Sequence, residues 1–160
     1  MLEGYVDIYL PDLKFFDPGL GADCAGAPDY FQRASAAILE MYRQTGPLQL
    51  DENGMLRRGL IVRHLVLPGE RKDSKKLLHW LSETLPVEGF YLSLMSQYTP
   101  YRPMERKALN RRTATFEYRW VQSIAQMLGF SGFSQDRTSA REEYTPPFDL
   151  TGVEKREEWP

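Results

Sequence analysis

The chain has 160 residues, 42% of them hydrophobic, which is enough for one domain with a packed core and is not the composition of a disordered polypeptide. A net charge of -2 gives no overall attraction to nucleic acid or to an anionic membrane. No stretch approaches the roughly 18 apolar residues of a membrane span, and the N-terminus lacks the pattern of a signal peptide. We therefore expect a cytoplasmic protein with no nucleic-acid or membrane partner.

A single cysteine, Cys24, limits the chemistry that the chain can perform alone. One thiol forms no intrachain disulfide and cannot supply the several cysteines of a structural zinc site or an iron–sulfur cluster. No cation or histidine is adjacent to Cys24 in the sequence, so an unreactive thiol is the favoured interpretation.

The first part of the chain predicts a strand and a helix. Residues 5–14 form an apolar run that is typical of a buried strand, and residues 17–21 indicate a turn. Apolar residues recur at helical spacing over 31–42, with Asp29 placed to cap this helix and Gly46 placed to end it.

A hairpin and a second helix follow. Residues 48–50 and 55–67 are prone to form strands, and Asn53-Gly54 between them favours a tight turn. Either Asp73 or Ser74 can cap the next helix. The apolar face of that helix consists of Leu77, Trp80 and Leu81.

The last predicted elements are a strand over 90–96, a helix over 116–128 and a short strand over 130–135. Strands that alternate with helices indicate βαβ units around a parallel sheet, so the fold class is α/β with parallel strands and flanking helices. A sheet of only three or four parallel strands has an edge strand with no neighbour on one side. We therefore expect residues 1–136 to be part of a larger domain, and residues 137–160, which lack periodicity, to be a surface tail.

Polar residues lie at predicted strand ends, where α/β folds bind ligands. Asp12 and Lys14 share one face of an extended chain, which suits binding of a hydroxyl and a carboxylate, although a solvent-exposed ion pair is the commoner arrangement. Arg63 and His64 interrupt an apolar run and must point to opposite faces. We expect His64 to be a hydrogen-bonded core residue, while Arg63 suits either a pair with an acid such as Asp7 or Asp12 or an anion.

Other candidates follow the strand over 90–96. Gln97 and Tyr98 are at a position where α/β folds present ligand groups, although such side chains are common in ordinary loops. The basic cluster between Arg102 and Arg112 suits phosphate or an acidic partner, and a solvated loop is the commoner case. The sequence contains no Gly-rich phosphate loop, Gly-x-Ser-x-Gly elbow or His-Glu-x-x-His pair, which removes support for common hydrolases and nucleoside triphosphatases.

Several of these segments, taken in order, resemble the radical SAM superfamily, specifically proteins similar to pyruvate formate-lyase-activating enzyme. The resemblance covers residues 5 to about 135. Several matching segments in the same order identify the family more specifically than any single segment does. The matching segments are Val6-Asp-Ile-Tyr-Leu-Pro-Asp-Leu-Lys14, Ala27-Pro-Asp-Tyr30, Gly59-Leu-Ile-Val-Arg-His-Leu-Val-Leu-Pro-Gly69 with Asp73-Ser74, and Leu94-Met-Ser-Gln-Tyr98.

The resemblance implies an open (β/α)6 barrel, which is a partial TIM barrel, and this chain is similar to its C-terminal half. It implies that Asp12 and Lys14 contact the ribose and methionyl part of S-adenosylmethionine. Arg63 would then lie near the methionyl carboxylate.

The rest of the implied cofactor site is less complete. Val66 and Leu67 would flank the adenine, and either Gln97 or Tyr98 would add a polar contact. The family binds a [4Fe-4S] cluster through a Cys-x3-Cys-x2-Cys loop, and neither this loop nor the Gly-Gly-Glu segment that holds the methionyl amine is in the chain. The ligands of the cluster are therefore missing, and Cys24 cannot replace them.

In intact family members, reductive cleavage of S-adenosylmethionine yields a 5′-deoxyadenosyl radical. We expect this chain to be inactive alone, with an N-terminal half-barrel supplied in trans or a partner protein substrate as its partner. The alternatives are a non-catalytic α/β interaction module, which uses its open edge or basic loop, and an S-adenosylmethionine-binding enzyme without a cluster.

Overall fold

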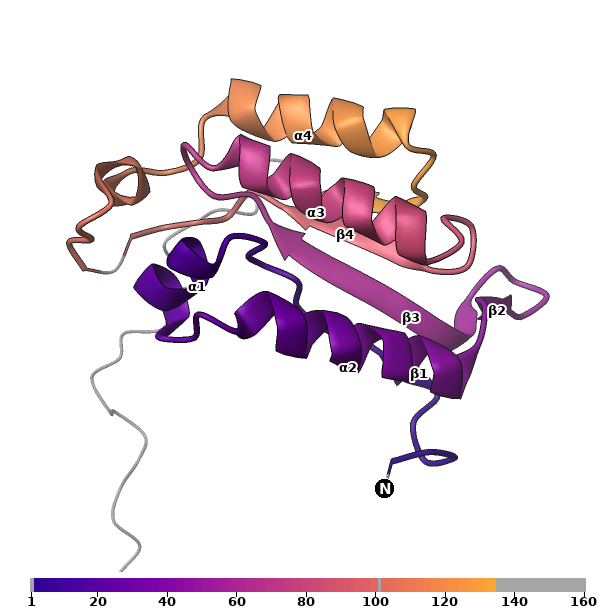
Figure 1. Cartoon of the computed structure of the whole chain (residues 1–160). Helices are drawn as coiled ribbons and strands as arrows, with labels where there is room; N and C mark the ends of the chain where they lie inside the picture. Colours follow the sequence, from indigo (N-terminus) through magenta and orange to yellow (C-terminus); the bar gives the residue numbers. More distant parts are fainter. Residues whose placement is uncertain (1, 101, 135–160) are drawn as a thin grey trace, which may run out of the picture.

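The computed structural model describes residues 2–100 and 102–134 and shows an open, mainly parallel sheet with helices beside it (Figure 1). This confirms the predicted α/β class. The predicted tail at 137–160 and the domain boundary after residue 136 lie outside the described residues.

The sheet has four parallel strands in the order β1-β3-β4-β5. They are β1 (Ile8–Tyr9), β3 (Leu56–Leu65), β4 (Tyr91–Met95) and β5 (Gly132–Ser134). A further strand, β2 (Gln49–Leu50), pairs antiparallel with the beginning of β3 through the predicted hairpin. The first strand is shorter than predicted, but its path continues beside β3 as far as a bridge between Asp12 and Arg63.

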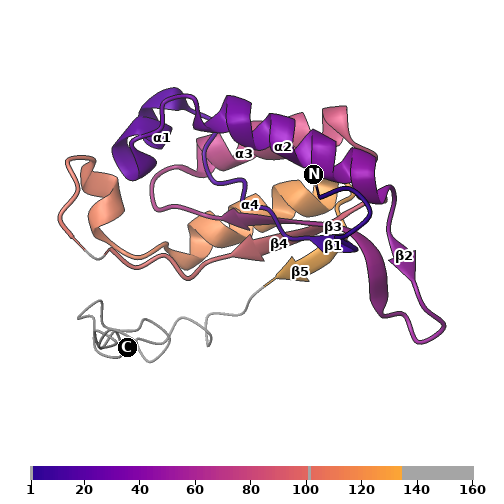
Figure 2. The same cartoon turned by 90° about the horizontal axis from the view of Figure 1, so that it is seen from below.

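Three helices cover one face of the sheet (Figure 2). They are α2 (Tyr30–Thr45), α3 (Arg71–Thr84) and α4 (Thr115–Met127). A short helix, α1 (Pro18–Ala25), and a 3-10 turn, η1 (Lys107–Asn110), lie near the carboxyl ends of the strands (Figure 1). Within the described ranges, no helix covers the opposite face of the sheet, and we call this the uncovered face (Figure 2).

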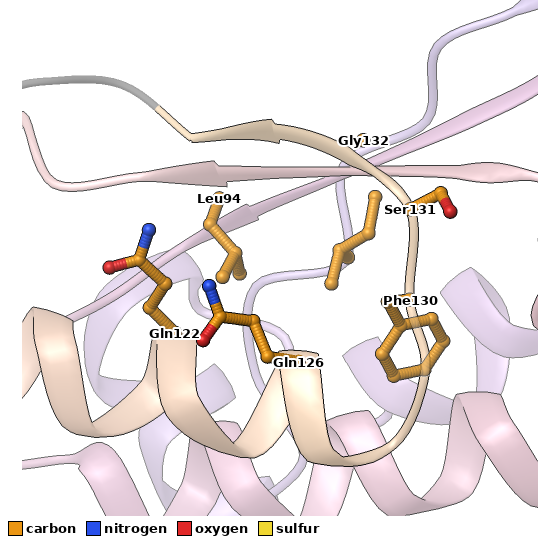
Figure 3. A pocket seen from close by; sticks show the side chains of 7 residues that line it. Leu94, Gln122, Gln126, Phe130, Ser131 and Gly132 are labelled. Carbon is orange, nitrogen blue, oxygen red and sulfur yellow. The ribbon is translucent and has the colours of Figure 1, made fainter.

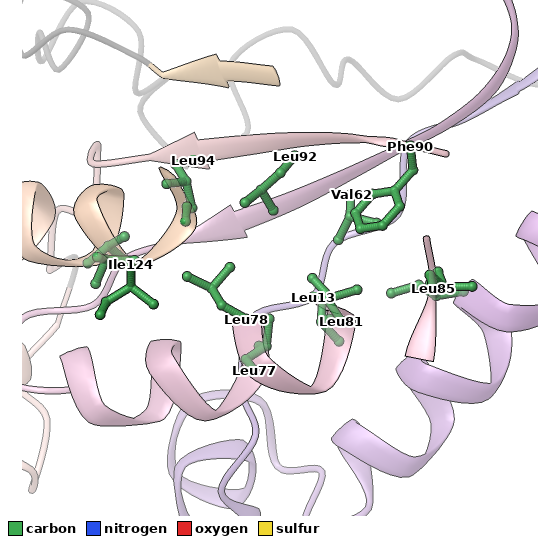
Figure 4. Close-up of a cluster of buried hydrophobic side chains, with 14 of the residues drawn as sticks. Leu13, Val62, Leu77, Leu78, Leu81, Leu85, Phe90, Leu92, Leu94 and Ile124 are labelled. Carbon is green, nitrogen blue, oxygen red and sulfur yellow. The ribbon is translucent and has the colours of Figure 1, made fainter. Parts of the chain in front are cut away.

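The main core lies between the sheet and its helices (Figure 4). Alternate residues of β3 and β4 are buried there, and each fully buried aliphatic side chain contributes about 1.5–3 kcal/mol relative to an exposed one. The side chains in this layer include Leu60, Val62, Leu77, Leu78, Leu81, Leu92, Leu94 and Ile124. Since strand side chains alternate, the intervening residues of β3 and β4 point to the uncovered face.

Two helix starts differ from the sequence prediction. Residues 17–21 are not an isolated turn: Asp17 caps α1 by accepting a hydrogen bond from the Leu20 amide at 2.9 Å, and Pro18 occupies the first turn, where its missing N–H costs nothing. Neither Asp73 nor Ser74 caps α3, because this helix begins at Arg71 and both residues are buried inside its first turn. Their side chains bind other segments instead.

Candidate functional site

A cluster of three charged side chains lies at the carboxyl end of the sheet. Asp12 is between two cations: its Oδ1 lies 2.8 Å from Arg63 Nη2, and its Oδ2 lies 3.1 Å from Lys14 Nζ. The three side chains are 30–42% exposed, so a ligand in solution can reach them. We call Asp12, Lys14 and Arg63 the charged cluster.

The charged cluster has unused hydrogen-bonding capacity. In the part of the chain that the structure describes, Asp12 Oδ1 and Arg63 Nε are buried without a hydrogen-bond partner. The contact between Asp12 and Arg63 is therefore an ion pair without hydrogen-bond alignment. Buried polar atoms in proteins are nearly always hydrogen-bonded, so these two atoms would gain partners if a polar ligand separated the two side chains.

The surroundings of the charged cluster are mixed. Arg63 pairs in register with Ser93 of β4, which supplies a hydroxyl on the same face. The neighbouring register pair, Leu65 and Met95, is half-buried and apolar. A ligand with a charged end and an apolar ring system would meet matching groups on this face.

His64 occupies the opposite face of β3 and is a core residue, as the sequence predicted. Its Nδ1 lies 2.7 Å from the Leu13 carbonyl oxygen, and its Nε2 lies 2.9 Å from Ser74 Oγ. Because a carbonyl oxygen only accepts, Nδ1 carries the proton and Nε2 accepts from the Ser74 hydroxyl. Burial lowers the pKa of His64 to about 4, although the bond to Leu13 opposes this shift. The imidazole is neutral at pH 7.

The other predicted cofactor contacts differ in burial and in their neighbours. Val66 packs in the main core, and Leu67 packs in a second apolar cluster, so neither side chain faces solvent. Tyr98 packs against that second cluster and donates a hydrogen bond to the Leu109 carbonyl at 2.9 Å. Gln97 is exposed. Ion pairs thus join three of the seven predicted residues, Asp12, Lys14 and Arg63.

Part of the basic loop is used inside the molecule. Arg106 forms ion pairs with Asp23 of α1 at 2.9 Å and with Glu70 at 3.0 Å. Arg111 pairs with the buried carboxylate of Glu117 at 2.8 Å. The Arg106 contacts attach the loop after β4 to α1 and to the segment before α3. The sequence favoured a solvated loop over recognition of phosphate or an acidic partner, and the structure shows that two of its arginines are ion-paired within the molecule.

Sequence patterns did not reveal two buried acids that bind backbone amides. Glu117 accepts hydrogen bonds from the Gly69 amide at 2.7 Å and the Ala114 amide at 2.9 Å, and Arg111 lowers its pKa to about 2. Asp73 accepts from two amides just after Lys14, at 2.8 and 2.9 Å. An acid within an amphipathic helix is ordinarily a surface residue, so only its place in the matched Asp73-Ser74 segment hinted at such a role.

An iron–sulfur cluster does not fit the described residues. Among them, no group of three or more histidine, cysteine or acidic side chains is arranged to hold a metal ion. Cys24 is half-buried, and burial raises the pKa of its thiol. The carboxylate and guanidinium groups of the charged cluster are instead of the kind that binds hydroxyl and carboxylate groups of an organic ligand.

A separate pocket of about 120 Å³ lies between α4 and the β4–β5 edge (Figure 3). Gln122 and Gln126 point into it from α4, and Leu94 lines it from the side of the sheet that the helices cover. It is therefore on the opposite side of the sheet from the charged cluster. None of the predicted site residues lines it.

No helix within the described ranges is both long and apolar enough to cross a membrane. No family model and no solved structure matches the chain. It is similar to an uncharacterized protein of Methanocaldococcus jannaschii, with 27% identity over 128 residues, or 79% of this chain. The chain spans only 33% of the length of that relative.

Proposed function

We propose that this chain is the S-adenosylmethionine-binding part of a radical SAM protein similar to pyruvate formate-lyase-activating enzymes, and that it forms the C-terminal half of an open (β/α)6 barrel. The observation that carries the proposal is the charged cluster. It lies on the uncovered face at the carboxyl ends of adjacent parallel strands, which is where α/β folds bind ligands, and two of its buried atoms lack hydrogen-bond partners.

The three residues have distinct roles in this proposal. The Asp12 carboxylate accepts hydrogen bonds from ribose hydroxyls, since an ionised carboxylate only accepts. Arg63 and Lys14 attract the methionyl carboxylate, and the Arg63 guanidinium can bind it through two parallel hydrogen bonds. In this proposal the adenine contacts Leu65 and Met95, which are half-buried on this face, and not the buried side chains of Val66 and Leu67.

S-adenosylmethionine supplies the 5′-deoxyadenosyl group whose radical is the reactive species of the family. The described residues bind and orient the cofactor, and they provide no ligands for the [4Fe-4S] cluster. In our proposal, the cluster loop belongs to an N-terminal half-barrel that packs on the uncovered face and pairs with the edge of β1. The match covers only 33% of the length of the archaeal relative, which supports a larger protein of this kind.

Calorimetric titration tests the cofactor site directly. S-adenosylmethionine and 5′-methylthioadenosine share the nucleoside, but only the first has the methionyl carboxylate. We expect Arg63→Met to weaken S-adenosylmethionine binding by at least about tenfold, because a charged hydrogen bond is lost, while binding of methylthioadenosine changes little.

The matched control is Arg57→Met, which removes another arginine of β3 that pairs with Asp51 at the hairpin. This variant should bind both ligands as the wild type does. Equal losses for the two ligands in Arg63→Met would refute the carboxylate contact, and failure of the wild type to bind either nucleoside would refute the cofactor site.

Anaerobic iron–sulfur reconstitution tests the split enzyme. We expect 5′-deoxyadenosine from S-adenosylmethionine only when the chain is combined with the polypeptide encoded immediately upstream. Product from the chain alone would contradict the missing cluster ligands, and product from neither preparation would count against a split enzyme.

A non-catalytic interaction module is the second candidate, and the edge of β1, which has no further strand beside it among the described residues, favours it. Unpaired backbone groups on an edge strand can bind an extended segment of another protein. This candidate predicts that the chain binds a partner protein but neither nucleoside.

A further inference from the structure

The backbone of the charged cluster lies on the edge of the sheet. Along the first strand, alternate residues bond toward β3: the Leu13 amide donates to the Arg63 carbonyl at 2.8 Å, and the Arg63 amide donates to the Pro11 carbonyl at 2.9 Å. The intervening residues, Asp12 and Lys14, therefore direct their backbone groups toward the free edge, where the described sheet has no further strand.

The hydroxyl of Tyr30 occupies this edge. It donates a hydrogen bond to the Asp12 carbonyl oxygen at 2.9 Å and accepts one from the Lys14 amide at 3.2 Å. A neighbouring strand would make one acceptor and one donor available at the same place. A single side-chain hydroxyl thus replaces a strand for one pair of residues.

Packing holds the Tyr30 ring at the sheet edge, and its hydroxyl stays protonated. Tyr30 begins α2, and its ring packs edge-on against Phe15 with centroids 4.9 Å apart. Burial raises the pKa of Tyr30, and the nearby Asp12 carboxylate adds to the increase, although the bond from the Lys14 amide opposes it. The hydroxyl therefore keeps its proton at neutral pH and can donate to the Asp12 carbonyl.

Other hydrogen bonds hold the residues near Asp12 and Lys14 and leave these two side chains free of them. His64 bonds to the Leu13 carbonyl, and Asp73 accepts hydrogen bonds from the amides of Phe16 and Asp17. Only Tyr30 bonds the backbone of Asp12 and Lys14 at the sheet edge in the hydrogen bonds of the described residues.

We propose that Tyr30 is a positioning residue whose hydroxyl closes the sheet edge at Asp12 and Lys14 and so fixes the two side chains that bind the cofactor. The inference rests on the proposed function for the identity of that cofactor. It also limits how another strand can join the sheet, since pairing along β1 must stop before Asp12.

Amide hydrogen exchange measured by NMR tests the positioning role without a ligand. In the wild type, the Lys14 amide should be protected although it lies on a sheet edge. Tyr30→Phe keeps the ring and removes only the hydroxyl, and we expect Lys14 exchange to accelerate at least about tenfold because the acceptor of the Lys14 amide is lost. The control, Tyr42→Phe on the same helix, should leave Lys14 exchange unchanged.

The same variants are then titrated with S-adenosylmethionine. Tyr30→Phe should weaken binding about fivefold at a temperature at which its melting curve shows that it is fully folded, and Tyr42→Phe should not. Unprotected Lys14 in the wild type, or equal Lys14 exchange in wild type and Tyr30→Phe, would overturn the inference. Faster exchange with unchanged affinity would overturn the positioning role. Absence of binding in the wild type refutes the proposed function separately, because the exchange measurement needs no ligand.

Discussion

Acidification from pH 7.5 to 5.0 should destabilise the protein through one residue, His64. Its imidazole is almost completely inaccessible to solvent, and it links the first strand to α3 through Leu13 and Ser74. Burial is the main reason that its folded-state pKa falls from 6.5 to about 4, since a charged imidazolium is poorly solvated there.

The direction and size of the effect follow from these two pKa values. Between pH 6.5 and pH 4, the unfolded chain binds a proton at His64 that the folded protein does not, so stability falls as the pH falls. The stabilisation is complete above the unfolded value of 6.5. Proton linkage gives a loss of about 2 kcal/mol between pH 7.5 and pH 5.0, approaching roughly 3 kcal/mol near pH 4.

Urea unfolding at pH 7.5 and pH 5.0 measures this loss, with His64→Asn as the variant that lacks the titrating ring. The free energy of unfolding should fall about 2 kcal/mol more in the wild type than in the variant. The raised pKa of Asp73 acts in the opposite direction at low pH, but it is present in both proteins and cancels in the comparison. Equal losses in wild type and His64→Asn would refute the assignment.

Two further predictions concern the supports of the fold. Glu117→Gln should lower the free energy of unfolding in urea by about 2–4 kcal/mol, because the buried carboxylate pairs with Arg111 and accepts two backbone hydrogen bonds; Arg119→Gln, on the exposed side of the same helix, should change it little, and similar losses would contradict this role. Gly132→Ala should destabilise by more than about 2 kcal/mol in the same assay, because its φ of 150° disfavours a side chain and a Cβ atom would overlap the Leu92 carbonyl; a wild-type unfolding midpoint would contradict this packing.

The elements that sequence predicted well are those set by local periodicity. The helical spacing over 31–42 gave α2, which ends at Gly46 with φ of 70°, and the Asn53-Gly54 turn gave the hairpin into β3. Hydrophobic period and turn chemistry act over a few residues, so they can be read without knowing the tertiary structure. Pairing of Arg63 with Asp12 was one of the alternatives offered for that arginine, and the structure shows this ion pair.

The contacts that sequence did not predict join residues far apart in the chain. Tyr30 bonds residues 16–18 positions earlier, and Asp73 bonds a segment 56–57 positions earlier. Neither partner is determined by spacing along a helix. The burial of Val66 and Leu67 was also not evident, because an apolar run predicts burial without saying which side chains turn away from a ligand.

The one-sided sheet connects folding of this region to ligand binding. In β3, Leu60 and Val62 pack beneath the helices, while Ile61 and Leu65 lie half-buried on the uncovered face beside Arg63. A strand that is apolar on both faces is typical of sheets that are covered on both sides. If further polypeptide covers this face, as we propose, it also removes water from the charged cluster and strengthens its electrostatic contacts. Completion of the sheet should therefore raise the affinity for S-adenosylmethionine, and by linkage the cofactor should stabilise the completed assembly by the same factor.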